Sequence, residues 1–186
     1  MKCINGFCDK KKKYISLDEN NSYILGEDNI GKLNLLLSYF LYKAPNIDSH
    51  HSPYIEADTH DSVFLDMMSS NWTYSFCPQN KKIETELEDM GLSGNSVCQK
   101  CKRFLCKRST QNCKRDKSRK ETELECLLRH IRNSIAHGHV FVTKAGNYIN
   151  VLLEDINPKN DNITARLVCR QSDLVNWKKI LQKAIK

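Results

Sequence analysis

The sequence predicts a mainly α-helical protein, a helical bundle that carries a small antiparallel β segment and ends in a C-terminal helix. Apolar residues recur at helical spacing in several separate stretches, and an alternating segment rich in β-branched residues follows the last long one. Hydrophobic residues make up 40% of the 186-residue chain, which is enough to bury one core of ordinary size. A mean hydropathy of −0.57 argues against an integral membrane protein, as does the lack of an apolar run near the ~20 residues that a membrane helix needs.

The first part of the chain differs in composition from the rest. Residues 1–28 are polar and include four consecutive lysines, which predicts an N-terminal arm, either a strand or a disordered segment. This arm lacks the apolar core of a secretory signal, so we expect a cytoplasmic protein with no membrane partner. Residues 29–186 are expected to form one domain.

The first half of this domain contains three predicted helices. The first starts near Asn29 and ends before Pro45, because a residue that precedes proline avoids the α region. Its apolar residues lie almost all around it, which predicts burial within the bundle. A short helix is expected within 62–76, with Val63, Phe64, Met67 and Met68 on one face, and a third helix at 83–90, where Gly91 ends it.

A long helix is predicted at about 119–137, after a basic, cysteine-rich insertion at about 92–118. Ser118 and Glu121 have the spacing of a capping box, which predicts the start of this helix. Gly138 is expected to end it.

Beyond Gly138 the period of the hydrophobic pattern changes from that of a helix to that of a strand. Two strands are predicted on either side of a turn at 144–147, with a third strand at 162–169. A final helix is expected after Ser172, which is placed to cap it.

Most of the positive charge is concentrated in one block. Residues 98–120 hold ten lysines and arginines and one acid, although the whole chain has a net charge of only +7. A local block of this kind predicts contact with a polyanion, and RNA or DNA is the obvious candidate. The candidate substrate-binding residues in this block are Lys100, Lys102, Arg103, Lys107 and Arg108. A solvated surface insertion is the alternative.

Nine cysteines is a high number for a chain without an export signal. Cys98, Cys101, Cys106 and Cys113 follow a C-x2-C-x4-C-x6-C pattern, and four thiolates could hold a structural zinc. Free thiols are the alternative, and no other cofactor is expected. Three further cysteines are predicted to be buried thiols in apolar surroundings: Cys77, Cys126 and Cys169.

The end of the long predicted helix, LLRHIRNSIAHGH at 127–139, carries the residues best suited to chemistry. A helical wheel places five apolar residues toward the core: Leu124, Leu127, Leu128, Ile131 and Ile135. Asn133 and His137 then point away from the core, and His137 lies in the last turn. An imidazole exchanges protons near neutral pH, and the guanidinium of Arg132 can hold a phosphate through paired hydrogen bonds. The alternative is an ordinary polar helix end.

Arg132 and His137 are five residues apart, roughly 140° around an ideal helix. They therefore cooperate best if the end of the helix is distorted, or if two copies of the chain pair so that both line one cleft. An RNA 2′-hydroxyl supplies an internal nucleophile, so such a site requires no metal ion in principle.

The string from Arg132 to Gly138 resembles the Rx4-6H signature of HEPN domains, in particular a subgroup found among toxin and phage-defence proteins. The resemblance implies a HEPN-like helical bundle over residues 29–186, acting as a metal-independent endoribonuclease. It also implies a homodimer whose active site forms at the interface from both motifs, and leaves room for an antitoxin or regulatory partner. In one subgroup a tyrosine stands two positions after the motif histidine, where this chain has His139. Regulation through such a tyrosine is therefore not expected here.

The resemblance also implies a role for each residue of the motif. Arg132 would position the phosphate and stabilise the transition state, Asn133 would orient the phosphate or the histidine, and His137 would transfer protons. Three neighbours could join the site: Arg129, His130 and His139. Two alternatives are a non-catalytic HEPN module that dimerises and binds RNA or a nucleotide, and a zinc-stabilised nucleic-acid-binding protein.

Overall fold

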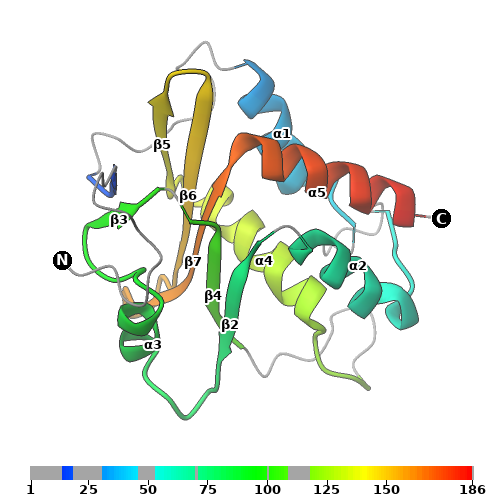
Figure 1. Cartoon of the computed structure of the whole chain (residues 1–186). Helices are drawn as coiled ribbons and strands as arrows, with labels where there is room; N and C mark the ends of the chain where they lie inside the picture. Colours follow the sequence, from blue (N-terminus) through cyan, green and yellow to red (C-terminus); the bar gives the residue numbers. More distant parts are fainter. Residues whose placement is uncertain are drawn as a thin grey trace.

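A computed structural model describes residues 14–18, 31–45, 53–69, 71–99, 101–108 and 118–185. At its centre lies a five-stranded sheet with the strand order β2-β4-β7-β6-β5 (Figure 1). Neighbouring strands run antiparallel except β2 and β4, which are parallel. The strands are β2 (Thr73–Cys77), β4 (Arg103–Lys107), β5 (Val140–Ala145), β6 (Tyr148–Ile156) and β7 (Ile163–Arg170).

Helices cover one face of this sheet, and a smaller layer covers the other (Figure 1). The larger layer consists of α1 (Gly31–Tyr42), the 3-10 turn η2 (Ala57–Thr59), α2 (His60–Met68), α4 (Glu123–Ala136) and α5 (Gln171–Ala184). The smaller layer consists of α3 (Ile83–Asp89) and an antiparallel pair, β1 (Tyr14–Ser16) and β3 (Ser96–Cys98). None of the helices in the described residues has the length and apolar character that a membrane crossing requires.

The prediction of a mainly helical bundle with a small β segment is wrong. Of the described residues, 42% are helical and 28% lie in strands, and the larger sheet has five strands. The predicted β segment at 140–170 is present as β5, β6 and β7, but β2 and β4 extend it. Periodicity cannot identify a strand as short as β4, and the many basic residues around it disguise its burial.

The segment predicted as a basic insertion contributes directly to the sheet. Within 92–118, β4 lies at an interior position between β2 and β7, and its first four residues are buried. β3 belongs to the same segment and pairs with β1, the described part of the N-terminal arm. Residues 109–117, like the rest of that arm, lie outside the described residues.

The other helices and strands agree well with the sequence. The predicted helices at 29–44 and 83–90 correspond to α1 and α3, and α3 ends before Gly91. Of the short helix predicted within 62–76, the first part is helical, as α2, whereas residues 73–76 belong to the strand β2. The wheel for α4 is confirmed, because its five predicted core residues are all buried. Asn29, near which α1 was predicted to start, lies outside the described residues.

Two predicted helix caps are wrong. α4 begins one turn later than expected, with Thr122 as its N-cap and Glu125 completing the capping box. Glu121, expected in that role, instead binds Arg129. α5 is preceded by Arg170, whose backbone N–H donates to Asp173, so Ser172 lies inside the helix.

Two buried arginines hold the loop that follows α3. The guanidinium of Arg103, which is fully buried, donates to the carbonyls of Met90, Gly91 and Cys98 at 3.0, 3.0 and 2.7 Å. Gly91 has a φ of +63°, and a Cβ there would lie 2.8 Å from Nη1 of Arg103. Arg166 pairs with Glu154 and also donates to loop carbonyls. These arginines stabilise the smaller layer against the sheet.

Candidate functional site

A cavity of about 590 Å³ lies beside the C-terminal half of α4. Four residues of α4 and its C-cap line it: Arg129, His130, Asn133 and His137. Asp155 at the end of β6, Lys107 and Arg108 at the end of β4, and Lys159 in the β6–β7 loop also line it. The cavity therefore brings Asn133 and His137 of the predicted motif together with cationic residues from distant parts of the chain.

The last turn of α4 places His137 at this cavity. The backbone N–H of His139 donates to the carbonyl of Ser134 at 2.8 Å, and that of Gly138 donates to Ile135 at 3.1 Å. This pair of bonds is a Schellman motif, and Gly138, with a φ of +75°, supplies its left-handed residue. The helix thus ends at a fixed point, with the His137 side chain exposed.

Asp155 anchors the polar side of α4 to the sheet. Its Oδ2 lies 2.6 Å from Nδ1 of His130 and accepts a hydrogen bond of 3.2 Å from the amide of Asn133. His130 and Asp155 are both buried. The side chain of Asn133 is thereby bound to Asp155.

The charges of this group depend on one another. Burial lowers the pKa of His130, but its hydrogen bonds to Asp155 and Cys126 outweigh burial, so the net shift is upward. Burial raises the pKa of Asp155, but the hydrogen bond and charge of His130, together with the hydrogen bonds of Asn133 and Thr164, outweigh burial, so the net shift is downward. Both shifts favour a charged pair between the imidazole and the carboxylate.

Arg129 is held on the other side of His130. Its Nε and Nη2 donate to the two carboxylate oxygens of Glu121 at 2.7 and 3.0 Å, a bidentate pair. Nη2 also lies 3.3 Å from Nε2 of His130 and 3.5 Å from Sγ of Cys126. These contacts raise the pKa of Arg129 despite its burial, so this cation is permanent.

Two thiols lie behind His130. The Sγ atoms of Cys106 on β4 and Cys126 on α4 are 3.5 Å apart, and both residues are fully buried. The hydrogen bond from Cys106, together with those from His130 and Arg129, lowers the pKa of Cys126 to about 4. Burial raises the pKa of Cys106.

The structure separates the other predicted site residues. Arg132 is half-buried and does not line the cavity, and His139 is half-buried with its Nδ1 lacking a partner among the described residues. Arg103 points into the smaller layer and is fully buried, so it is not available to RNA. Lys102 pairs with Asp173 at 2.7 Å, and Lys100 lies outside the described residues.

Three of the four cysteines predicted to bind zinc are described, and these three do not form one group of metal-ligating side chains. Sγ of Cys106 lies 3.5 Å from Sγ of Cys126. Among the described residues, Cys98 and Cys101 belong to no group of three convergent metal-ligating side chains. Cys113 lies outside these residues.

Sequence reasoning missed Asp155 and the contact of Cys106 with Cys126. No local pattern links the end of β6 to the middle of α4, because their contact depends on strand register. The i, i+4 spacing of Cys126 and His130 was a usable signal, since such residues are neighbours on a helix.

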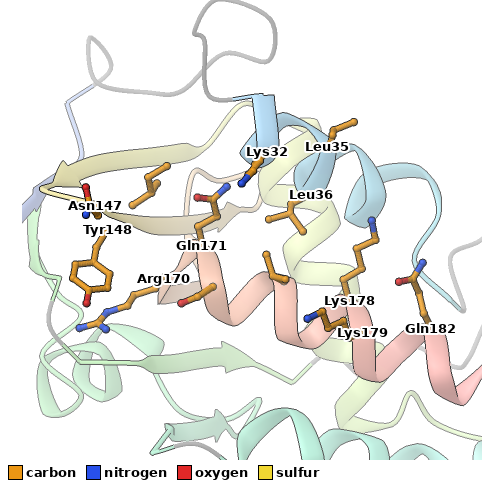
Figure 2. Close-up of a pocket in the computed structure, with 13 residues that line it drawn as sticks. Lys32, Leu35, Leu36, Asn147, Tyr148, Arg170, Gln171, Lys178, Lys179 and Gln182 are labelled. Carbon is orange, nitrogen blue, oxygen red and sulfur yellow. The ribbon is translucent and has the colours of Figure 1, made fainter.

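A second cavity, of about 470 Å³, lies between α1, α5 and the β5–β6 hairpin (Figure 2). Lys32, Arg170, Lys178 and Lys179 contribute its charge, and no carboxylate lines it. Figure 2 shows Arg170 beside Tyr148, with the guanidinium carbon 4.8 Å from the ring centre. This cavity suits an anion, but among its lining residues it has no histidine or carboxylate for proton transfer.

A family model described as HEPN pEK499 p136 matches residues 2–185. The chain belongs to the HEPN family. HEPN membership supports a nuclease, RNA-related or nucleotide-binding role for this chain. Neither a curated protein nor a solved structure matches the chain.

Proposed function

We propose that this HEPN protein is a metal-independent endoribonuclease, acting as a toxin or phage-defence effector. The observation that carries the proposal is the cavity at the end of α4, where exposed His137 meets Asn133 and Arg129 beside cationic residues from β4 and the β6–β7 loop. Family membership supports an RNA-related activity, and this cavity is where the family motif meets positive charge.

In this mechanism the 2′-hydroxyl of RNA attacks the adjacent phosphorus, and the bond to the 5′-oxygen of the next nucleotide breaks. The imidazole of His137 takes up the proton of the 2′-hydroxyl or gives one to the departing 5′-oxygen, as histidine commonly does in general acid–base catalysis. The products carry a 2′,3′-cyclic phosphate and a 5′-hydroxyl. Attack of water on the cyclic phosphate then breaks its bond to the 2′-oxygen and leaves a 3′-phosphate and a 2′-hydroxyl.

The remaining residues bind and orient the phosphate. Three cations around the cavity attract the RNA backbone toward it: Lys107, Arg108 and Lys159. Solvent screens their charges less inside the cavity than on the open surface. Asn133, held by Asp155, orients the phosphate relative to His137. Arg132 stabilises the charge that develops on the phosphoryl oxygens.

Arg132 does not line the cavity of its own chain, which supports a site shared by two chains. In a homodimer, the ends of the two α4 helices face one cleft, and the two copies of Arg132 and His137 complete it together. An antitoxin or another regulatory partner would restrain such a nuclease by covering this cleft.

The experiment that tests the proposal compares a labelled RNA with a DNA of the same sequence. We expect RNA-only fragments with 2′,3′-cyclic phosphate or 3′-phosphate ends, formed at an undiminished initial rate when EDTA is added at the start. Cleavage of both nucleic acids, or cleavage that EDTA stops at once, would indicate a different mechanism or a contaminating nuclease.

A non-catalytic HEPN module that dimerises and binds RNA or a nucleotide is the second candidate function. The cavity in Figure 2 favours it, because it offers four cations and an exposed aromatic ring, with no histidine or carboxylate among its described lining residues. RNA that is bound but recovered intact would identify this function.

A further inference from the structure

Three side chains converge in the interior between β4 and α4. Their potential ligand atoms, from Cys106, Cys126 and His130, all lie within 4.8 Å of one another. The three residues are at most 2% exposed. Sulfur and imidazole ligands of this kind are those that zinc prefers in proteins.

We propose that Cys106, Cys126 and His130 bind a zinc ion that joins β4 to α4. This site is independent of the proposed ribonuclease chemistry, since the ion lies in the interior and takes no part in moving protons at the phosphate. It also differs from the set predicted from the sequence, with which it shares only Cys106.

The spacing of the donors suits zinc. With Zn–S bonds of about 2.3 Å, a tetrahedral ion places two sulfurs roughly 3.8 Å apart. The sulfurs of Cys106 and Cys126 are 3.5 Å apart, so small rotations about the two side-chain bonds bring them to that distance. Cys126 and His130 are one helical turn apart, so the same helix presents both.

The groups that usually surround bound zinc are also in place. A zinc-bound histidine commonly donates its other ring N–H to a carboxylate, and Nδ1 of His130 lies 2.6 Å from Asp155. This contact directs Nε2 toward the sulfurs. Arg129 donates to Sγ of Cys126, a contact that helps a thiolate to form.

The charges balance when zinc binds. Cys106 loses its thiol proton to solvent, Cys126 binds as the thiolate, and Nε2 of His130 gives up its proton to solvent, so the two thiolates neutralise the 2+ charge of the ion. Nη2 of Arg129 must move away from Nε2 of His130, while Nε keeps its bond to Glu121. The adjoining cavity reaches Arg129, His130 and Asp155. A water molecule from this cavity can therefore occupy the fourth coordination position of the ion.

Such an ion would fix the helix that carries the family motif. Cys126 and His130 precede Asn133 and His137 on α4, and Cys106 comes from the interior strand β4. Loss of the ion would therefore loosen α4 from the sheet. We expect loss of the ion to lower the thermal stability first, and to change the arrangement of residues in the cavity only after that.

The test uses the full-length protein, purified with reductant and stripped of metal, and titrated with Co²⁺. We expect one Co²⁺ per chain, with thiolate-to-cobalt charge transfer and the strong visible bands of a tetrahedral site, and displacement by Zn²⁺. Zn²⁺ should also raise the melting temperature of the stripped protein. Neither readout depends on RNA cleavage, so failure of this inference and failure of the proposed function are distinguishable.

Variants then assign the ligands. Cys106→Ser and Cys126→Ser should each remove most of the charge-transfer absorption. Cys77→Ser should keep it, because Cys77 is equally buried but faces the carbonyls of Pro78 and Lys81. Absence of stoichiometric Co²⁺ binding by folded wild-type protein would overturn the inference. So would bands that persist in both variants, or a disulfide between Cys106 and Cys126 in protein kept under reductant.

Discussion

Oδ2 of Asp155 on β6 lies 2.6 Å from Nδ1 of His130 on α4. Both residues are buried, and the same oxygen accepts from Asn133. The contact fixes the rotation of α4 against the sheet at the turn before His137. The position of the family motif thus depends on a strand that follows it in the chain.

Replacing this carboxylate should destabilise the fold. Asp155→Asn removes the charge opposite the buried His130, and breaking such a pair costs about 3 kcal/mol. Urea unfolding should show this loss, whereas Asp161→Asn, in an exposed turn with a φ of +55°, should stay within about 0.5 kcal/mol of wild type. Equal stability of the two variants would mean that Asp155 does not anchor α4.

The start of α4 can be tested with two substitutions. Thr122→Ala removes the N-cap hydroxyl and its contact with Nδ1 of His60, and should cost about 1–2 kcal/mol of unfolding free energy. Ser118→Ala, at the cap that the sequence predicts, should cost clearly less. The reverse order in thermal or urea unfolding would place the start of the helix at Ser118.

Tyr39 should make stability depend on alkaline pH. Burial raises the pKa of its hydroxyl to about 12, above the ordinary value near 10. The folded state therefore holds this proton more tightly than the unfolded state. The resulting stability is fully present below about pH 10 and is lost as pH rises toward 12.

Tyr39→Phe is the matched variant, because it removes the titrating group and keeps the ring beneath Lys178. Its unfolding free energy should fall less steeply between pH 9 and 11 than that of wild type. At pH 7 it should be at least as stable, since the hydroxyl has no hydrogen-bond partner among the described residues. Parallel pH profiles for the two proteins would contradict the shifted pKa.

The cations around the cavity should govern RNA affinity. Lys107→Ala and Lys159→Ala should each weaken binding of all sequences alike and reduce the salt slope by about 1. Lys144→Ala, an exposed lysine on β5 outside both cavities, serves as the control. Binding measured at several salt concentrations checks this, and an unchanged slope in both cavity variants would exclude this cavity as the RNA site.

The sequence predicts those features of the fold that local periodicity determines. The apolar residues of α4 and the alternation in β5, β6 and β7 were sufficient to find these elements. β4 was missed because five residues are too few to show a period and its flanks are basic. The class of the fold was therefore misjudged.

The candidate site was predictable only in part. The position of His137 at an exposed helix end follows from Gly138 and the apolar arc of α4. The burial of His130 does not, because it depends on Asp155 from a strand that only the folded sheet brings near. Arg103 was predicted to bind RNA because it belongs to a basic block. It is instead buried, and its guanidinium donates hydrogen bonds to backbone carbonyls.

The central claim is tested most directly by the rate of RNA cleavage with His137→Ala, measured beside Arg132→Ala and an Arg170→Ala control. Loss of proton transfer should lower the rate by roughly 10²-fold or more. We expect both motif variants to be folded, dimeric and inactive, while Arg170→Ala keeps wild-type activity. Undiminished cleavage by a pure Arg132→Ala, His137→Ala double variant would contradict the proposed mechanism.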